Sequence, residues 1–382
     1  MTSHDDTAAG IVESTVPAFR CKLSQLIYNI YKENMNIYFP AEWHNQQFVQ
    51  MTWPHMHTDW APVIDEAIDC FCNIARDIAR HEQLLIASQY PDETLEHLAK
   101  RGIESDNIIV AQCLTNDSWA RDHAFLSCLD KDSGTIVLRD FQFNGWGLKF
   151  AANHDNMINT NVLDIIKDLY AGATCLYENC LDFVFEGGSV ESDGEGTLMV
   201  TSSCLLSPNR NNTVDQKGIE QRLKNEFNAK RVLWVNHSWL AGDDTDGHID
   251  TVARFCSASS IAYVKCYDTC DEHYDELEAM EAELQAFRTA DGQPYKLFPL
   301  PLPDPCFDEE GNRLPATYAN FLIINGAVLM PTYNQPQKDE EAANQLAKAF
   351  PGYEIIGVDC CVLIKQHGSL HCSTMQYPSA EH

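Results

Sequence analysis

Acidic side chains and one histidine crowd into residues 242–250, which read Gly-Asp-Asp-Thr-Asp-Gly-His-Ile-Asp. His248 and Asp250 are two positions apart, so on an extended strand their side chains would point to the same face. An imidazole beside a carboxylate suits acid–base catalysis next to a group that binds positive charge. We interpret the segment as a candidate site. The alternatives are an exposed polar turn and a divalent-metal site built from His248 and the aspartates.

A calcium-binding loop is a further alternative, because Asp244 and Asp246 are followed by Gly247, as at the start of an EF-hand. An EF-hand needs a glutamate at its final position, and Phe255 occupies that position here. The sequence therefore does not support an EF-hand.

Three other segments combine charge, aromatic rings and glycine in a way that a core would not require. They are 116–122 (Asn-Asp-Ser-Trp-Ala-Arg-Asp), 185–188 (Phe-Glu-Gly-Gly) and 367–372 (His-Gly-Ser-Leu-His-Cys). Each follows or ends a predicted strand, where loops on a rigid scaffold usually carry function. The chain has 15 cysteines, and neither residue type nor spacing distinguishes Cys372 from the others. Most of them are expected to be small core residues.

Composition restricts the classes of function. Of the 382 residues 45% are hydrophobic, so the chain can bury a core. No apolar run approaches the roughly 18 residues that span a bilayer. The formal net charge of −30 argues against nucleic acid as a partner and would concentrate cationic small molecules. Residues 1–17 lack the pattern of a secretion signal, so we expect a cytoplasmic protein with reduced thiols and no membrane contact. The sequence leaves the oligomeric state open, a homo-oligomer included.

Helices and short strands alternate along the chain. Apolar spacing predicts helices over 23–31, 61–80, 161–170, 216–228, 274–288 and 339–350. Runs of β-branched and aromatic residues predict strands over 84–87, 108–112, 135–143, 231–235, 261–265 and 318–324.

Two stretches look like copies of one unit. In 196–235 and in 326–358, a strand is followed by a loop with proline and asparagine, a helix and a second strand. Such units pack around a common axis, because none can bury its own apolar face. We therefore predict an α/β fold of five ββαβ units, a five-bladed propeller in a single domain. A doubly wound sheet is the alternative, but it would want a Gly-rich phosphate turn after the first strand, which the sequence lacks.

Ordered motifs across residues 39–376 resemble the agmatine deiminases and their microbial peptidylarginine-deiminase relatives. The motifs are 39–43 (Phe-Pro-Ala-Glu-Trp), 51–55 (Met-Thr-Trp-Pro-His), Asp59-Trp60, 116–122, 143–147 (Phe-Asn-Gly-Trp-Gly), 186–189 (Glu-Gly-Gly-Ser), 193–197 (Asp-Gly-Glu-Gly-Thr), 207–210 (Ser-Pro-Asn-Arg), 245–250 and His371-Cys372. The resemblance implies a five-bladed α/β propeller, in agreement with the repeats. We expect this domain at 39–376, after an N-terminal extension with a helix (1–38) and before a C-terminal tail (377–382).

By that resemblance the chain is an enzyme that hydrolyses a guanidine, with agmatine as the leading substrate. The resemblance implies four catalytic residues: the nucleophile Cys372, the acid–base His248, and Asp122 and Asp250, which hold the guanidinium. It also implies three residues around the substrate: Glu186, Asp244 and Trp119.

The sequence departs from the family next to two of these residues. Residues 366–369 (Gln-His-Gly-Ser) replace the usual glycine-rich run before the catalytic cysteine. Residues 123–125 (His-Ala-Phe) replace a turn of a small residue, glycine and proline after Asp122. Both changes bear on the shape of the pocket, and hence on the substrate rather than on the chemistry.

The residue types suit this chemistry. Aspartates orient the poorly electrophilic guanidinium carbon through charge-assisted, bidentate hydrogen bonds. Acidic neighbours raise the pKa of a thiol, so we predict a neutral Cys372 that ionises when the cation binds. By the resemblance, His248 then protonates the departing nitrogen, so that ammonia leaves, and activates the water that releases a urea. For agmatine this product is N-carbamoylputrescine. The reaction needs no metal and no organic cofactor.

Three other functions remain open. Deimination of peptidyl-arginine or another guanidine uses the same residues, but the relatives that act on peptides are typically exported. An amidinotransferase would pass the group bound to Cys372 to an amine instead of water. A non-catalytic binding propeller would be expected to lack the catalytic residues, and the sequence keeps all four.

Overall fold

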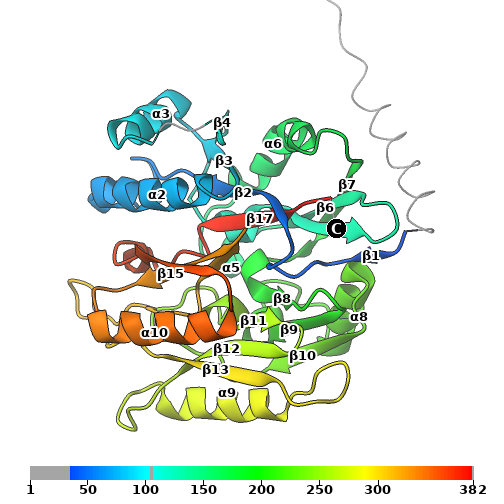
Figure 1. The fold of residues 1–382 in the computed structure, drawn as a ribbon, viewed down its shortest axis with the longest axis vertical. Coiled ribbons are helices and arrows are strands. Elements are labelled where there is room, and N and C mark those ends of the chain that lie inside the picture. Colours follow the sequence, from blue (N-terminus) through cyan, green and yellow to red (C-terminus); the bar gives the residue numbers. More distant parts are fainter. Residues whose placement is uncertain (1–34, 104–105, 381–382) are drawn as a thin grey trace, which may run out of the picture. The chain divides into compact units, whose positions relative to one another are not determined.

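The computed structural model describes residues 35–103 and 106–380, and the chain from Ile37 onward forms one compact unit (Figure 1). The helix predicted over 23–31 lies outside the described residues. Among the described residues, no helix is long and apolar enough to cross a membrane.

Five separate sheets make up this unit, and each contains the same strand pattern. In each, an antiparallel pair (β17–β2, β5–β6, β8–β9, β11–β12 or β14–β15) continues into a parallel partner. The sheets are β17-β2-β3-β4 (Thr374–Pro378, Gln46–Thr52, Gln83–Ser88, Ile108–Gln112), β1-β5-β6-β7 (Ile37–Tyr38, Leu126–Asp130, Ile136–Gln142, Cys175–Val184), β8-β9-β10 (Val190–Ser192, Thr197–Thr201, Arg231–Val235), β11-β12-β13 (Ala253–Ser257, Ser260–Lys265, Lys296–Pro301) and β14-β15-β16 (Leu322–Ile324, Ala327–Thr332, Glu354–Asp359). None of these sheets closes on itself within the described chain.

In every sheet a helix connects the second strand of the antiparallel pair to its parallel partner. These helices are α2 (Ile64–Ala79), α6 (Asp155–Leu169), α8 (Gln216–Phe227), α9 (Tyr274–Ala286) and α10 (Pro336–Ala349). In Figure 1 they lie at the outside, with the strands between them. Each buries one apolar face, as α8 does with Ile219, Leu223 and Phe227 at helical spacing. The fold is therefore α/β, and the repeats predicted over 196–235 and 326–358 are confirmed as β9-α8-β10 and β15-α10-β16.

Most predicted elements are confirmed, but α6 begins at Asp155 instead of residue 161, and several strands, among them β2, β7 and β13, were not predicted. Three further differences have a local reason. The helix predicted from residue 61 begins with a 3-10 turn, Ala61–Val63, before α2. Helix α3 (Pro91–Lys100) was not predicted, because only Thr94 and Leu98 are buried and its apolar pattern is weak. The strand predicted over 318–324 is shortened to β14, because residues 318–321 form a buried loop before it.

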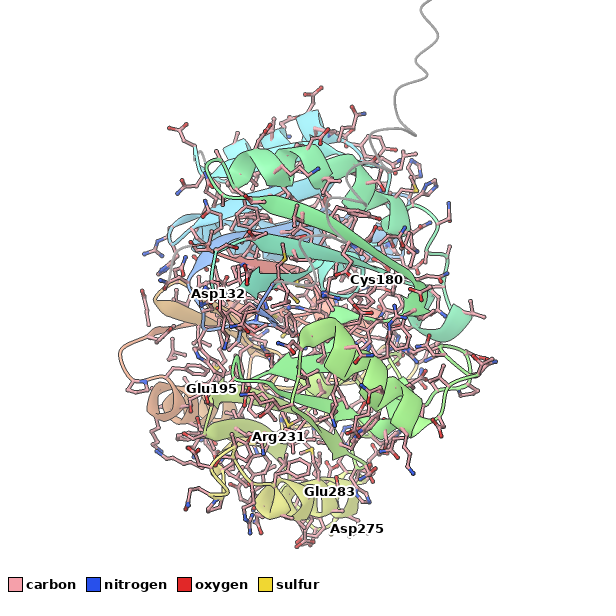
Figure 2. The ribbon with its side chains drawn as sticks, turned by 90° about the vertical axis from the view of Figure 1, so that its right-hand side faces the viewer. Asp132, Cys180, Glu195, Arg231, Asp275 and Glu283 are labelled. Atoms are coloured by element: carbon pink, nitrogen blue, oxygen red, sulfur yellow. The ribbon has the colours of Figure 1, made fainter. Side chains whose placement is uncertain are left out.

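Many acidic side chains lie on the surface, and most described cysteines lie in the core. Asp132, Glu195 and Asp275 are exposed on turns and on α9, where Figure 2 labels them. Most described cysteines are buried free thiols, and Cys270 is exposed. Strand β17 extends to Pro378 and so includes the first two residues of the predicted C-terminal tail.

Candidate active site

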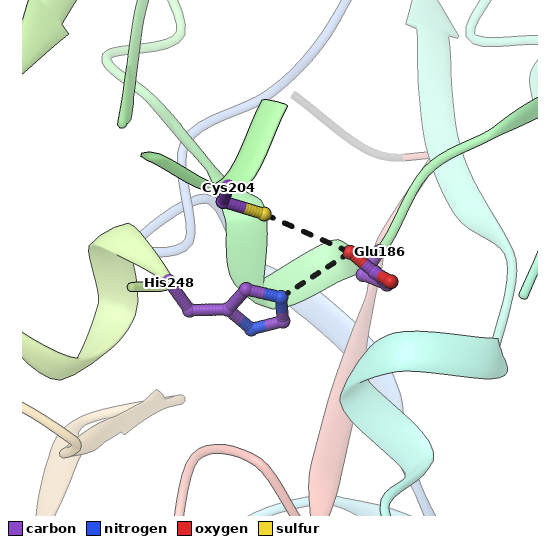
Figure 3. Close-up of side chains that lie close together, drawn as sticks. All are labelled: Glu186, Cys204 and His248. Carbon is purple, nitrogen blue, oxygen red and sulfur yellow. Dashed lines mark hydrogen bonds and ion pairs between the residues drawn. The ribbon is translucent and has the colours of Figure 1, made fainter. Parts of the chain in front are cut away.

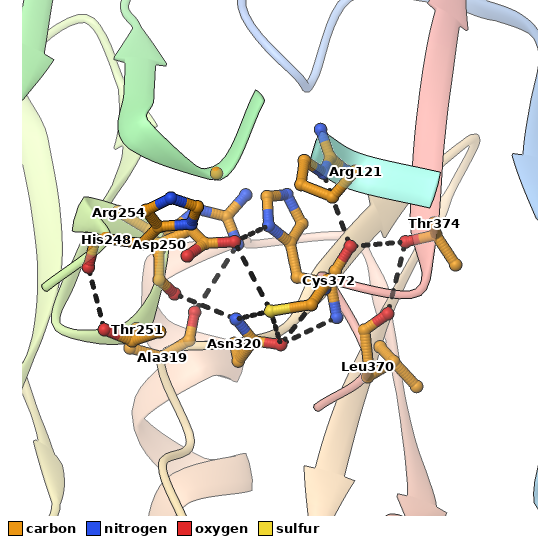
Figure 4. Close-up of polar contacts among 12 residues, drawn as sticks. Arg121, His248, Asp250, Thr251, Arg254, Ala319, Asn320, Leu370, Cys372 and Thr374 are labelled. Atoms are coloured by element: carbon orange, nitrogen blue, oxygen red, sulfur yellow. Dashed lines mark hydrogen bonds and ion pairs between the residues drawn. The ribbon is translucent and has the colours of Figure 1, made fainter. Parts of the chain in front are cut away.

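Five loops carry polar residues to one place. Each loop directly precedes the first strand of one of the five antiparallel pairs. The residues are Asp122 in the short helix α4 (Ala120–His123) before β5, Glu186 before β8, Asp250 in the 3-10 turn Ile249–Thr251 before β11, Asn320 before β14 and Cys372 before β17. Segments far apart in the sequence thus meet, and Figure 4 shows Asp250, Asn320 and Cys372 side by side.

The Cys372 sulfur lies among hydrogen-bonding oxygens and one amide. Its Sγ is 3.9 Å from Asp250 Oδ2 and 3.3 Å from Asn320 Nδ2 (Figure 4). Burial raises the pKa of Cys372 well above its ordinary value, and the charges of Asp250 and Asp122 raise it further. This is the direction that the sequence predicts for an acidic site, and it favours the neutral thiol.

Asp250 is held by a chain of buried charges. His371 Nδ1 is 2.7 Å from Asp250 Oδ2, and its Nε2 is 2.8 Å from Glu42 Oε2. Arg254 in turn pairs with Glu42 and Glu191. Burial would raise the pKa of Asp250, but its hydrogen bond with His371 and the nearby positive charges outweigh burial and lower it. Asp250 therefore remains a carboxylate.

His248 is held between two carboxyl groups. Its Nε2 lies 3.3 Å from Glu186 Oε2, and its Nδ1 lies 3.7 Å from Asp122 Oδ1. Burial lowers the pKa of His248, but Asp122, Cys204 and Glu186 outweigh burial and raise it well above its ordinary value. The imidazole is thus held in its protonated form.

Glu186 lies behind His248 and is fully buried. Arg210 Nε donates to both of its oxygens, at 2.8 and 3.1 Å. Cys204 Sγ is 3.8 Å from Glu186 Oε2, so Glu186, Cys204 and His248 form a compact group (Figure 3). Their possible ligand atoms lie within 4.8 Å of one another. Because the Arg210 guanidinium already neutralises Glu186, this group is poorly suited to a metal cation.

Asp122 is oriented by two donors. Trp146 Nε1 donates to Oδ2 at 2.9 Å, and the backbone of Gly188 donates to Oδ1 at 3.0 Å. A Cβ added to Gly188 would lie 2.5 Å from His248 Nδ1 and 3.0 Å from oxygens of both Asp122 and Asp250. Glycine at position 188 thus allows the three side chains to approach one another closely.

Two buried atoms at this place have no hydrogen-bond partner among the described residues. They are His248 Nδ1 and Asp250 Oδ1. Buried polar atoms nearly always have a hydrogen-bond partner in folded proteins. Two such atoms without a partner, close together beside a cavity, are suited to binding a ligand. The ligand would offer a donor to the Asp250 oxygen.

A cavity of about 170 Å³ leads outward from Cys372. Its lining residues are Asp59, Asp117, Trp119, Asp122, Trp146, Phe150, Asp244, Thr245, Thr251, Gln366, His367, Gly368 and Cys372. The lining carries four aspartates, and no lysine or arginine from the described part of the chain contributes to it. Burial raises the pKa of Asp117 to about 6, and the neighbouring charge of Asp59 raises it in the same direction.

The predicted site residues are found in different parts of this arrangement. Cys372, His248, Asp122 and Asp250 come together, although the extended strand expected at 248–250 is a 3-10 turn. Asp244 and Trp119 line the cavity further out. Glu186 contacts His248 on the side away from Asp122, and like His248 and Asp250 it is not among the residues that line the cavity.

The two departures from the family pattern differ in their consequences. Gln366, His367 and Gly368 line the cavity, with Gly368 packed against Trp119. The other replaced turn, 123–125, faces the protein interior: His123 Nε2 contacts Thr52 Oγ1 at 3.2 Å, and burial lowers the pKa of His123 to about 3. Of the two changes, the one at 366–369 bears directly on the cavity.

Sequence reasoning missed Asn320 and the roles of Glu42, His371 and Trp146. Glu42, Trp146 and His371 stand in motifs that the resemblance includes, so motif membership was an available signal. Asn320 had no such signal, because only the folded chain brings it to Cys372.

Comparison with known proteins agrees with this geometry. The sequence model of the Porphyromonas-type peptidyl-arginine deiminase family matches residues 38–378. The chain belongs to this family. An agmatine deiminase from Pseudomonas aeruginosa is 30% identical, covering 89% of this chain and 95% of its own.

Solved structures of relatives have the same fold. The "Putative Arginine Deiminase" from Porphyromonas gingivalis is 47% identical, with a TM-score of 0.81, over 90% of this chain and 99% of its own. A C. jejuni agmatine deiminase with substrate bound is 35% identical, with a TM-score of 0.80, over 89% of this chain and 96% of its own. Membership of the family is thus supported by both sequence and fold.

Proposed function

We propose that this protein is a cysteine-dependent amidine hydrolase that converts agmatine to N-carbamoylputrescine and ammonia. One observation carries the proposal. At the inner end of an acidic cavity, Cys372 Sγ lies 3.9 Å from an Asp250 carboxylate that has one unpaired, buried oxygen.

The inner end is suited to a planar cation. Asp250 Oδ1 is free to accept from a guanidinium, and Asp122 lies on the other side of Gly188. Charge-assisted hydrogen bonds donated by the guanidinium to both carboxylates would fix the plane of the cation and offset the cost of removing it from water. The guanidinium carbon would then face the sulfur, which is the orientation that attack requires.

The protonation states fit the order of the steps. The bound cation offsets the charges of Asp250 and Asp122, so the Cys372 thiol releases its proton to solvent through the cavity and the thiolate attacks the carbon. Protonated His248 donates its proton to the departing nitrogen, and ammonia leaves. Neutral His248 then takes a proton from water, and this water cleaves the amidino-thioether, releases the urea and restores the cysteine.

The outer part of the cavity favours agmatine over arginine. Agmatine carries an ammonium at the end of its arm, whereas arginine carries a carboxylate as well. Asp59, Asp117 and Asp244 line the outer part, without a described lysine or arginine to bind a carboxylate. We assign Asp244 and Trp119 to the arm of the substrate, and Glu186 to the orientation of His248.

Peptidyl-arginine is the second candidate substrate, because the family model carries that description. A single panel separates the two: ammonia release from agmatine, arginine, a peptidyl-arginine and simple alkylguanidines, measured in parallel. Agmatine should have the highest kcat/KM. Preferred release from peptidyl-arginine, or release from none of the four, would reject the proposal.

We also infer that the five sheets are blades of a propeller around one axis, within a domain that spans about residues 39–376. The support is the repetition of the strand order and the convergence of one loop from each sheet on Cys372. For the same reason the site requires all five repeats, and we infer that no single repeat would be active alone.

A further inference from the structure

A second cavity shares a loop with the catalytic cavity but has no part in the proposed mechanism. Its volume is about 410 Å³, which is in the range of small-molecule sites. The loop after β2, the end of β3 and helices α2 and α3 line it, and we call it the α2–α3 cavity. Strands β2 and β3 are parallel, and ligands of α/β proteins commonly bind at the carboxyl ends of parallel strands.

Three rings form one part of the lining. The ring centroids of His55, His57 and Tyr90 lie 5.6 to 6.3 Å apart, and no two of these rings are parallel. The backbone N–H of His57 donates to His55 Nδ1 at 3.1 Å, so the ring proton of His55 is on Nε2, which contacts Thr115 Oγ1 at 3.0 Å. Burial lowers the pKa of His55, and His57 lowers it further. His55 is therefore neutral, and the faces of such rings attract organic cations.

Two carboxylates form another part of the lining. Asp65 lies in the first turn of α2 and Glu93 in the first turn of α3, and both are exposed. No lysine or arginine of the described chain lines the cavity. An anion is disfavoured, because the two carboxylates already occupy the helix turns at which an anion would bind. The α2–α3 cavity is thus suited to a cation.

Two buried nitrogen atoms on lining residues have no hydrogen-bond partner among the described residues. They are Trp53 Nε1 and His97 Nδ1, and Trp53 is only 3% exposed. Buried polar atoms nearly always have a partner, and an indole N–H can only donate. A carbonyl oxygen on the ligand would satisfy it. Ile64 and Ile68 add apolar surface for an alkyl chain.

The loop between β2 and α2 joins the two cavities. His55 lines the α2–α3 cavity, and Asp59 lines the catalytic cavity. Thr58 Oγ1 donates to the backbone oxygen of His55 at 2.6 Å. The His55 ring also contacts Thr115, two residues before Asp117, which lines the catalytic cavity as well. A cation held against His55 therefore lies behind a wall that carries two of the catalytic cavity's aspartates.

We propose that the α2–α3 cavity is a second, non-catalytic site for an alkylammonium ion that carries a carbonyl group, and that this ligand weakens binding of the substrate cation. The ammonium would contact the rings and the carboxylates of Asp65 and Glu93, and the carbonyl would accept from Trp53. N-carbamoylputrescine belongs to this chemical class. Binding of the ligand does not depend on the proposed function, whereas its effect as a product inhibitor rests on it.

Isothermal titration calorimetry with N-carbamoylputrescine tests the site. The wild type should bind two equivalents, one in each cavity. Glu93→Gln should weaken one of the two sites by roughly threefold to fivefold, since an exposed carboxylate contributes little alone, and Asp65→Asn/Glu93→Gln by about tenfold. Glu96→Gln is the matched control on the same helix, because its carboxylate pairs with Lys100 at 2.6 Å and does not line the cavity. It should bind as the wild type does.

A second probe tests the carbonyl group without a change to the protein. The diamine 1,4-diaminobutane has the same chain and no carbonyl, so it should bind in the α2–α3 cavity roughly fivefold more weakly than N-carbamoylputrescine. Equal affinities of the two compounds there would overturn the contact with Trp53.

Steady-state kinetics tests the link between the cavities. In the wild type and in Glu96→Gln, the apparent KM for agmatine should rise faster than linearly with N-carbamoylputrescine, because the second site adds to competition at Cys372. In Asp65→Asn/Glu93→Gln the rise should be linear. A linear rise in the wild type would overturn the link.

The calorimetry also separates this proposal from the proposed function. A single binding site in the wild type, or unchanged affinities in Asp65→Asn/Glu93→Gln, would overturn the second site even in an active enzyme. If no guanidine is hydrolysed, the proposed function fails while the calorimetry still tests the α2–α3 cavity.

Discussion

At the inner end of the cavity, Cys372, His248 and Asp250 are buried and are contacted by further polar groups that are buried themselves. At the outer end, Asp244 and His367 are 41% and 39% exposed and make few contacts. The inner groups are fixed because their partners would lose buried hydrogen bonds if they moved. The outer groups face solvent, so a change of residue there costs little. The groups proposed for bond cleavage therefore lie in the more rigid inner region, and those proposed for substrate specificity lie in the less rigid outer region.

The largest effect is expected from the reacting atom itself. Cys372→Ser should lower kcat for ammonia release by roughly 10⁴-fold or more, because a buried hydroxyl among carboxylates does not ionise. Cys270→Ser, at an exposed thiol, is the control and should retain full activity. Substantial turnover by Cys372→Ser would show that the inner end is not where bond cleavage occurs.

The second-largest loss of activity is expected from adding one methyl group at the inner end of the cavity. In Gly188→Ala the new Cβ would lie 2.5 Å from His248 Nδ1, which must then move. Displacement of a catalytic group by about 1 Å is expected to lower kcat/KM roughly 100-fold. Gly357→Ala is the matched control, because its Cβ meets only the Thr332 methyl group at 3.1 Å. Equal activity of the two variants would mean that the inner end is not tightly packed.

The pKa of Cys372, at the inner end of the cavity, should depend on the substrate cation that enters through the outer end. Ultraviolet titration of the wild type minus Cys372→Ala should show a thiol that is neutral at pH 7. A bound guanidine that is not turned over should lower its pKa by about one to three units. The sign follows from the causes: burial and two carboxylates raise the pKa, and the cation opposes the carboxylates. A thiolate already formed at neutral pH in the empty site would contradict this.

The smallest effects are expected at the outer end. Asp244→Asn should raise KM for agmatine by about threefold to fivefold with kcat unchanged, since an exposed charge contributes little. His367→Gly should behave similarly, and its backbone should tolerate glycine because φ is +62°. An alkylguanidine without the terminal amine serves as the comparison and should be unaffected by Asp244→Asn. A large loss of kcat in either variant would remove the distinction between the two ends.

The elements and the repeat were largely accessible from the sequence. Helices over 216–228 and 274–288 and strands over 108–112 and 231–235 follow from apolar spacing, which depends on local periodicity. The strand over 318–324 was too long because its first residues are apolar enough to fit a strand pattern. In the folded chain those residues reach the site, where Asn320 satisfies backbone groups of another loop.

The sequence by itself determined the residue types that react and the α/β repeat that carries them. Motifs and periodicity are local properties, so His248, Asp250 and the two repeats could be found without a structure. The family resemblance named Cys372 among the cysteines, which residue type and spacing could not do. Only the tertiary structure decided that Glu186 lies behind His248 and that Asn320 contacts the sulfur. The physical reason is that these contacts join different repeats, and their distances depend on how the sheets pack rather than on the order of residues.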